Sequence, residues 1–169
     1  IIDCNILDSH FQHLCRLPLF HLDLSDTQVS DKATEVIRGY YGLSFLSLNG
    51  AKVSADGMAN LIVLGELKEL FLCRVPVGDD ALPHLAKLPH LECLWLRDTN
   101  VSDGGVDVLG GMRTLRSLQL NGTRVTLEGA TKLRKSLTHA TIYWHKEVWE
   151  PSGERHVDQD GAETDRYQQ

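Results

Sequence analysis

One apolar phrase returns five times in this chain at a fixed interval of 24 residues, and this period limits the fold to one class. The phrase reads LFHLDL from Leu19, LSFLSL from Leu43, LKELFL from Leu67, LECLWL from Leu91 and LRSLQL from Leu115. Periods of about 20–50 residues are typical of solenoids, in which each unit buries its apolar face only against its neighbours. Solenoids offer long exposed surfaces and seldom carry chemistry, so the period favours a binding role over a catalytic one.

Each unit changes its apolar spacing halfway along its length. The alternating leucines of the phrase predict a short strand with one buried face, and they form two aligned columns: Leu22, Leu46, Leu70, Leu94, Leu118 and Leu24, Leu48, Leu72, Leu96, Leu120. Later apolar residues fall three apart, as in Leu82, Leu85 and Leu88, which indicates a helix. Helix-start signals lie between the two halves: Ser30-Asp31, Ser54, Asp79-Asp80, Ser102-Asp103 and Thr126. Stacked units of this kind give a parallel sheet on one side and a row of short helices on the other.

These residues resemble leucine-rich repeat proteins, and most closely the short bacterial type written LxxLxLxxTxVTDxGLxxLxxLPx. The fourth unit, LECLWLRDTNVSDGGVDVLGGMRT, follows that pattern almost letter for letter, and the resemblance covers about residues 6–144. It implies an α/β fold, a right-handed superhelix with a parallel sheet on the concave face and helices on the convex face. Many members place Asn in the turn after the strand, where this chain has Thr27, Ala51, Val75, Thr99 and Thr123. Thr can replace some of the amide's hydrogen bonds, whereas Ala51 and Val75 cannot.

The repeat boundaries predict four segments. Residues 1–18 are a partial or degenerate N-terminal repeat or cap, 19–138 are five repeats, 139–151 are a capping strand and segment, and 152–169 are a disordered acidic tail. Ile142 and Trp144 continue the leucine columns as a sixth strand, and we expect Val148 and Trp149 to fold back over the last repeat. The chain opens on the helical half of a unit without an initiator Met, which favours a piece of a longer protein; a degenerate cap is the alternative.

Composition and charge exclude several classes of function. The net charge is −6, and residues 145–169, with three basic and seven acidic side chains, carry −4 of it, so the folded part has a charge near −2. A nucleic-acid surface needs a basic stripe, and this charge argues against one. No apolar run approaches the ~20 residues of a membrane span. Cys73 and Cys93 differ by four positions in strand register, about 13 Å, which is too far for a disulfide. Cys4 and Cys15 flank the first predicted helix and remain a possible pair, while free thiols favour a reducing compartment.

The chain has no motif typical of an enzyme with a bound nucleotide, phosphate or activated serine, and we expect no cofactor. His10 and His13 have the helical spacing of two metal ligands, but His21 is only a loose candidate for the third ligand of a catalytic metal. A metal-dependent enzyme is therefore the least favoured hypothesis.

The candidate site lies on the concave face, where the residues between the strand leucines point away from the core. Phe71 and Trp95 are neighbours in this pattern and are expected to be exposed, as an apolar anchor with a charged rim. The predicted binding residues for a protein or peptide partner are Phe45, Glu69, Phe71, Cys73, Cys93, Trp95, Arg97, Arg116 and Gln119. One alternative is that the rings only pack against each other, a flank or the tail. Another is self-association through this patch or through the uncapped N-terminal end, as a structural segment of a larger protein.

Overall fold

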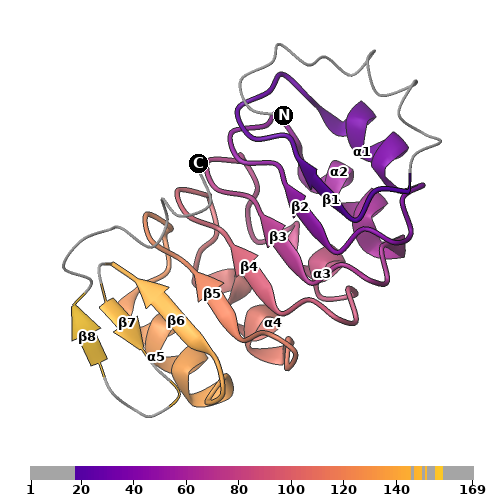
Figure 1. Ribbon diagram of the computed structural model, residues 1–169. Coiled ribbons are helices and arrows are strands. Elements are labelled where there is room, and N and C mark those ends of the chain that lie inside the picture. Colours follow the sequence, from indigo (N-terminus) through magenta and orange to yellow (C-terminus); the bar gives the residue numbers. More distant parts are fainter. Residues whose placement is uncertain (1–17, 146, 150, 152–154, 158–169) are drawn as a thin grey trace.

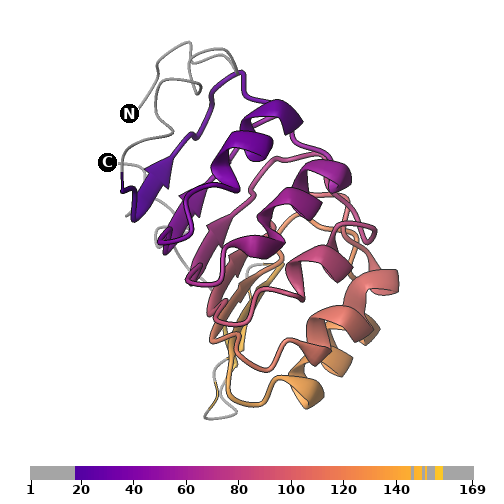
Figure 2. The same cartoon turned by 90° about the vertical axis from the view of Figure 1, so that its right-hand side faces the viewer.

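The computed structural model describes residues 18–145, 147–149, 151 and 155–157, and it is a solenoid with strands in one layer and helices in the other (Figures 1 and 2). The predictions for residues 1–17 fall outside this range, including the His10 and His13 metal site and the Cys4–Cys15 pair. Within the described ranges, each helix is too short or too polar to span a lipid bilayer.

One strand comes from each repeat, and each pairs in parallel with the next. The strands are β1 (His21–Asp23), β2 (Phe45–Ser47), β3 (Glu69–Phe71), β4 (Cys93–Trp95), β5 (Ser117–Gln119) and β6 (Thr141–Trp144). Leu22 pairs with Leu46 and Leu46 with Leu70, so that the 24-residue period is the register of the sheet. The α/β repeat fold predicted from the leucine columns is therefore confirmed.

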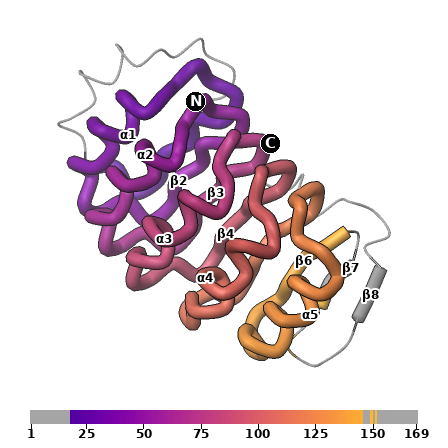
Figure 3. The backbone as a smooth tube through the Cα atoms, turned by 180° about the vertical axis from the view of Figure 1, so that it is seen from behind, coloured from indigo at the N-terminus to yellow at the C-terminus, as the bar shows by residue number. Residues whose placement is uncertain are grey.

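The helices form the second layer and follow one another in a row behind the sheet (Figure 3). They are α1 (Asp31–Ile37), α2 (Ala55–Ala59), η2 (Asn60–Val63), α3 (Leu82–Leu85), η3 (Asp103–Gly105), α4 (Val106–Gly111) and α5 (Leu127–Ser136). The core lies between the two layers, where the strand leucines meet a helical column of buried side chains: Ile37, Leu61, Leu85, Leu109 and Leu133. Burial of large apolar side chains on these two faces holds each repeat against its neighbours.

The turn after each strand uses two devices that recur with the same period. One residue per turn has a left-handed backbone, at Asp26, Gly50, Arg74, Asp98 and Gly122. Thr27, Thr99 and Thr123 follow, and each buried hydroxyl donates to the carbonyl three residues earlier at 2.7 Å. These hydroxyl bonds stay within one turn, and Ala51 and Val75, at the same position in repeats 2 and 3, have no hydroxyl to make them.

Side-chain caps begin most of the helices, as the sequence predicts. The side chains of Ser30, Ser54, Ser102 and Thr126 each accept a hydrogen bond from a backbone N–H of the first turn. The prediction for Asp79-Asp80 is wrong, because the N-cap of α3 is Ala81, which makes no side-chain cap bond.

Asp79 instead ties its repeat to the next one. Its two carboxylate oxygens accept from the backbone N–H and the hydroxyl of Ser102, at 2.8 and 2.5 Å. Asp31 binds Ser54 in the same way at 2.7 and 2.7 Å, and Asp103 binds Thr126 at 2.8 and 2.6 Å. We call this contact the inter-repeat lock.

A glycine completes each inter-repeat lock, because the carboxylate lies where a side chain would start. A Cβ placed on Gly57, Gly105 or Gly129 would lie 2.2, 2.8 or 2.1 Å from Oδ1 of the locking aspartate. The lock therefore has three members: Asp in one repeat, and Ser or Thr with Gly in the next.

The C-terminal end of the sheet changes direction after β6. Strand β7 (Glu147–Trp149) pairs antiparallel with β6, and β8 (Arg155–Val157) pairs antiparallel with β7. Trp149 is buried, and its ring centroid lies 5.9 Å from that of Trp144, whose Nε1 donates to the Val125 carbonyl at 2.9 Å. The expectation of disorder from residue 152 onward is wrong at Arg155–Val157, where the exposed edge of β7 supplies backbone partners. The rest of 152–169 lies outside the described residues.

Candidate functional site

The concave face is the sheet face that points away from the helices, and the strand register fixes which of its side chains are neighbours. Phe71 pairs with Trp95 and Glu69 with Cys93 across strands β3 and β4. The structure thus brings the centre of the predicted site together on adjacent strands.

Four rings on strands β1 to β4 form a continuous row, which we call the aromatic ladder: His21, Phe45, Phe71 and Trp95. His21 and Phe45 stack with centroids 3.8 Å apart, and Phe71 and Trp95 stack with centroids 4.2 Å apart and planes within 7°. Phe45 meets Phe71 edge to face at 5.0 Å. Strands separated by about 4.8 Å place rings of one face at the distance that favours such stacking.

The aromatic ladder is more deeply buried than the sequence pattern predicts. Phe71 is only 2% exposed and Phe45 is 9% exposed, whereas Trp95 is half-buried and His21 is exposed. The expectation that Phe71 is an exposed anchor is wrong, because its ring is packed between neighbouring rings. Phe71 and Phe45 support the face, and Trp95 and His21 are the ladder members that reach solvent.

Polar side chains beside the ladder are also buried and bind the turns. Asn49 Oδ1 accepts from the Cys73 backbone N–H at 2.7 Å, and Gln119 Oε1 accepts from the Asn121 N–H at 3.0 Å. Ser47 is 1% exposed, and its hydroxyl lies 2.7 Å from that of Ser25. Gln119, a predicted contact residue, is therefore buried beneath the concave surface and supports it. The sequence analysis does not identify this role of Asn49. The Asn-Gly pair, whose Gly50 has a left-handed backbone, is the sequence signal that could have indicated a turn bond there.

Charged side chains lie at the rim of the concave face. Arg97 follows Trp95 by two residues and contacts its neighbour Asp98 at 3.3 Å, with both side chains nearly half exposed. Arg116 contacts Glu92 at 3.6 Å, and its side chain is exposed, while Glu69 is half-buried. Exposed ion pairs of this kind contribute little to stability, so these groups are free to exchange partners.

The two cysteines of the site are unpaired thiols. Since Cys93 pairs in register with Glu69, Cys73 and Cys93 lie four positions apart on neighbouring strands, and the prediction that they form no disulfide is confirmed. Burial raises the pKa of the Cys93 thiol to about 12 and also raises the pKa of Cys73. Both thiols are protonated at neutral pH, which is the unreactive form of cysteine.

We expect these thiols to make the fold less stable in alkali. Unfolded thiols ionise as the pH rises through about 9, whereas the native Cys93 thiol keeps its proton up to a pKa of about 12. The stabilising contribution is complete below pH 9 and is lost between pH 9 and 12. Urea midpoints measured from pH 8 to 10.5 should therefore fall less steeply for Cys93→Ser than for the wild type. Equal slopes would contradict a buried, protonated Cys93.

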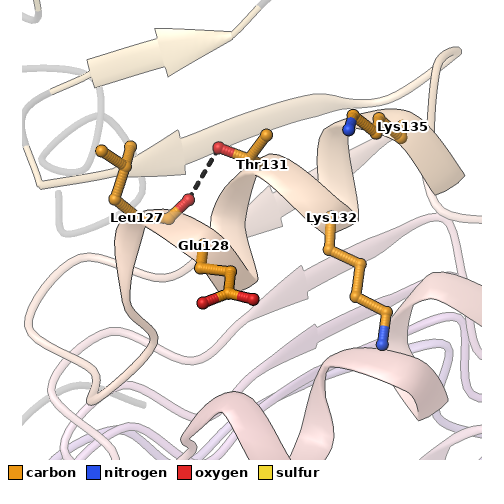
Figure 4. A pocket seen from close by; sticks show the side chains of 5 residues that line it. All are labelled: Leu127, Glu128, Thr131, Lys132 and Lys135. Atoms are coloured by element: carbon orange, nitrogen blue, oxygen red, sulfur yellow. Dashed lines mark hydrogen bonds between the residues drawn. The ribbon is translucent and has the colours of Figure 1, made fainter.

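Among the described residues, no group of three His, Cys, Asp or Glu side chains is placed to hold a metal ion. A hollow of about 460 Å³ lies along the outer face of α5 (Figure 4), and Leu127, Glu128, Thr131, Lys132 and Lys135 line it. Thr131 donates to the Leu127 carbonyl at 2.7 Å, and Lys132 contacts Asp107 of α4 at 2.6 Å. All of its described lining comes from one helix, so that the hollow is a surface groove with no converging functional groups.

Comparison with known proteins agrees with this architecture. The family model described as leucine-rich repeat matches residues 111–133. No curated protein sequence matches the chain. Solved structures show the same fold at low sequence identity, and many share it.

Three of these structures illustrate the likeness. An internalin of Listeria monocytogenes strain 4b F2365 covers 77% of this chain at 19% identity with a TM-score of 0.57. Internalin C2 of the same strain covers 80% at 18% identity with a TM-score of 0.59. A leucine-rich repeat protein of Leptospira interrogans covers 73% at 17% identity with a TM-score of 0.53. The chain spans 42%, 64% and 36% of the length of these three proteins, respectively.

Proposed function

We propose that this chain, a leucine-rich-repeat protein by fold, is a non-catalytic module that binds a protein or peptide on its concave face. The fold is typical of protein-interaction modules, and function within it depends on the surface side chains. The observation that carries the proposal is the half-buried Trp95 held flat on Phe71, with the exposed Arg97 two residues further along the chain, in the turn after β4. Trp and Arg are enriched among the residues that dominate binding energy.

The buried part of the aromatic ladder supports this role by fixing Trp95 in place. Phe71 stacks on Trp95 and is itself held by Phe45, so that the indole is already ordered before a partner arrives. A side chain that is ordered in advance loses less conformational entropy on binding. We assign Trp95, Arg97, Glu69 and Arg116 to contact with the partner, and Phe45, Phe71, Cys73, Cys93 and Gln119 to the support of that surface.

We expect a Trp95→Ala/Arg97→Ala double variant to bind its partner at least about 2 kcal/mol more weakly, roughly 30-fold, while it still unfolds cooperatively. The measurement is affinity capture from a lysate of the source organism, followed by titration calorimetry with the captured protein after it is purified. Lys87→Ala, an exposed substitution outside the concave face, is the matched control and should bind as the wild type does.

The outcomes separate the proposal from its alternatives. A partner that the wild type and the double variant retain equally would place the site elsewhere, on the helices or the ends. Light scattering of the two proteins tests self-association: a concentration-dependent dimer that the double variant loses would make a second copy the partner.

A further inference from the structure

The inter-repeat lock is present at three of the four seams between the described repeats, and the fourth seam lacks it. The locked seams join repeats 1 and 2 through Asp31, repeats 3 and 4 through Asp79, and repeats 4 and 5 through Asp103. At the seam between repeat 2 (residues 43–66) and repeat 3 (residues 67–90), the corresponding position is Ala55.

All three members of the lock change together at this seam. Ala55 has no carboxylate, Gly78 has no hydroxyl at the position of Ser54, Ser102 and Thr126, and Ala81 replaces the glycine. The Ala81 methyl group is fully buried. It lies at the position where a locking carboxylate excludes a Cβ in the other seams. All three members of the lock are therefore missing at this seam. An aspartate introduced at position 55 alone would clash with the Ala81 methyl group.

Helix α3 begins at this seam without a side-chain cap, whereas α2, η3 and α5 begin at the capping residues Ser54, Ser102 and Thr126. It has four residues, Pro83 lies in its first turn, and its N-cap Ala81 supplies no side-chain bond. Its first backbone bonds, Ala81 to Gly78 and Leu82 to Asp79, are 3.2 and 3.3 Å long. Repeat 3 is bonded to repeat 4 through Asp79, whereas no carboxylate bond of this kind joins it to repeat 2 among the described residues.

The sheet layer is intact at the same seam. Strands β2 and β3 pair in register, Asn49 Oδ1 accepts from the Cys73 N–H at 2.7 Å, and Phe45 contacts Phe71 edge to face. The sheet side of this seam is therefore joined by hydrogen bonds, whereas its helix side is held by apolar packing without the lock.

We propose that this seam is a hinge, at which α2 and η2 separate from α3 while β2 and β3 stay paired. The motion bends the solenoid into two blocks, repeats 1–2 and repeats 3–5, about an axis along the sheet. The motion changes the curvature of the concave face between Phe45 and Phe71. A partner that contacts β1 to β4 together therefore binds one conformation of the hinge in preference to the others. The hinge itself does not depend on the proposed binding function.

Native-state hydrogen exchange of the full chain, read by mass spectrometry, tests this hinge. In the wild type, amides of α2, η2 and α3 should exchange faster than those of η3, α4 and α5 under conditions in which the sheet stays protected. Installing the lock with Ala55→Asp/Gly78→Ser/Ala81→Gly should slow exchange across α2 to α3 about tenfold or more, because two hydrogen bonds to a carboxylate are added.

Two further variants keep the test decisive. Ala55→Asp/Gly78→Ser, which retains the Ala81 methyl group, should give less protection than the triple variant. The reverse transplant, Asp79→Ala/Ser102→Gly/Gly105→Ala, should move the fast-exchanging seam to the boundary between repeats 3 and 4. This variant tests the hinge on its own if the triple variant that installs the lock does not fold. Uniform exchange along the wild-type helices, or an exchange pattern that the transplants leave unchanged, would overturn the proposal.

Discussion

Replacing Phe71 with alanine should lower the free energy of unfolding by about 3 kcal/mol. We expect this effect although Phe71 lies on the concave face of the sheet, opposite the leucine core. The ring is 2% exposed, stacks on Trp95 and meets Phe45 edge to face. Its removal opens a cavity between the two rings, and Phe45 can move into that cavity only by giving up its stacking contact with His21. Urea unfolding followed by circular dichroism measures the effect directly.

The matched control for this variant is Tyr41→Ala, because Tyr41 is a large aromatic residue that is 69% exposed. That substitution should change stability by no more than about 0.5 kcal/mol. If Phe71→Ala lowers the free energy of unfolding by less than about 1 kcal/mol, the ring is a surface group. Phe71 is then the exposed binding residue that the sequence pattern predicts.

Replacing Gly129 with alanine should destabilise the protein by about 2 kcal/mol. The new Cβ would lie 2.1 Å from Oδ1 of Asp103 and 3.1 Å from Cγ2 of Val106, so the carboxylate must move. Its two bonds to Thr126, at 2.8 and 2.6 Å, are then lost together. The backbone of Gly129 is not left-handed, so the cost arises from the lock and not from backbone strain.

Gly111→Ala is the matched control, since no atom lies within 4 Å of a Cβ at that position in α4. It should be neutral or stabilising by up to about 1 kcal/mol, because alanine favours the helix. A double-mutant cycle with Asp103→Ala isolates the cause. If the lock is responsible, Gly129→Ala costs much less once the carboxylate is absent, and equal costs in both backgrounds would argue against it.

The repeat period predicts the fold well because one register applies to every strand. Once Leu22, Leu46 and Leu70 are aligned by sequence, the parallel pairing, the buried face and the helix row follow from the stacking of identical units. The caps at Ser54 and Thr126 are equally local, since a hydroxyl before a helix bonds the first turn of that same helix.

The candidate site is less predictable, because alternation shows which face a residue occupies and not how deeply it is covered. Phe71 is buried by rings from adjacent strands, a contact between residues that are 24 or more apart in the chain. Asp79 binds the following repeat instead of its own helix, and this partner cannot be seen within one unit. Strand β8 pairs outside the repeats altogether, so the period carries no information about it.

The three-part lock also restricts which repeats can be neighbours. Removing one repeat of 24 residues around position 110 would bring Asp79 against Thr126 and Gly129, a combination that already occurs as a lock elsewhere in the chain. Removing one around position 60 would instead bring Asp31 against Gly78 and Ala81, where it finds no hydroxyl and meets a methyl group. Repeats with the same leucine pattern therefore differ in the turn residues that form the lock. A repeat can be added or removed without loss of a lock only where one new neighbour supplies the Asp and the other supplies Ser or Thr together with Gly.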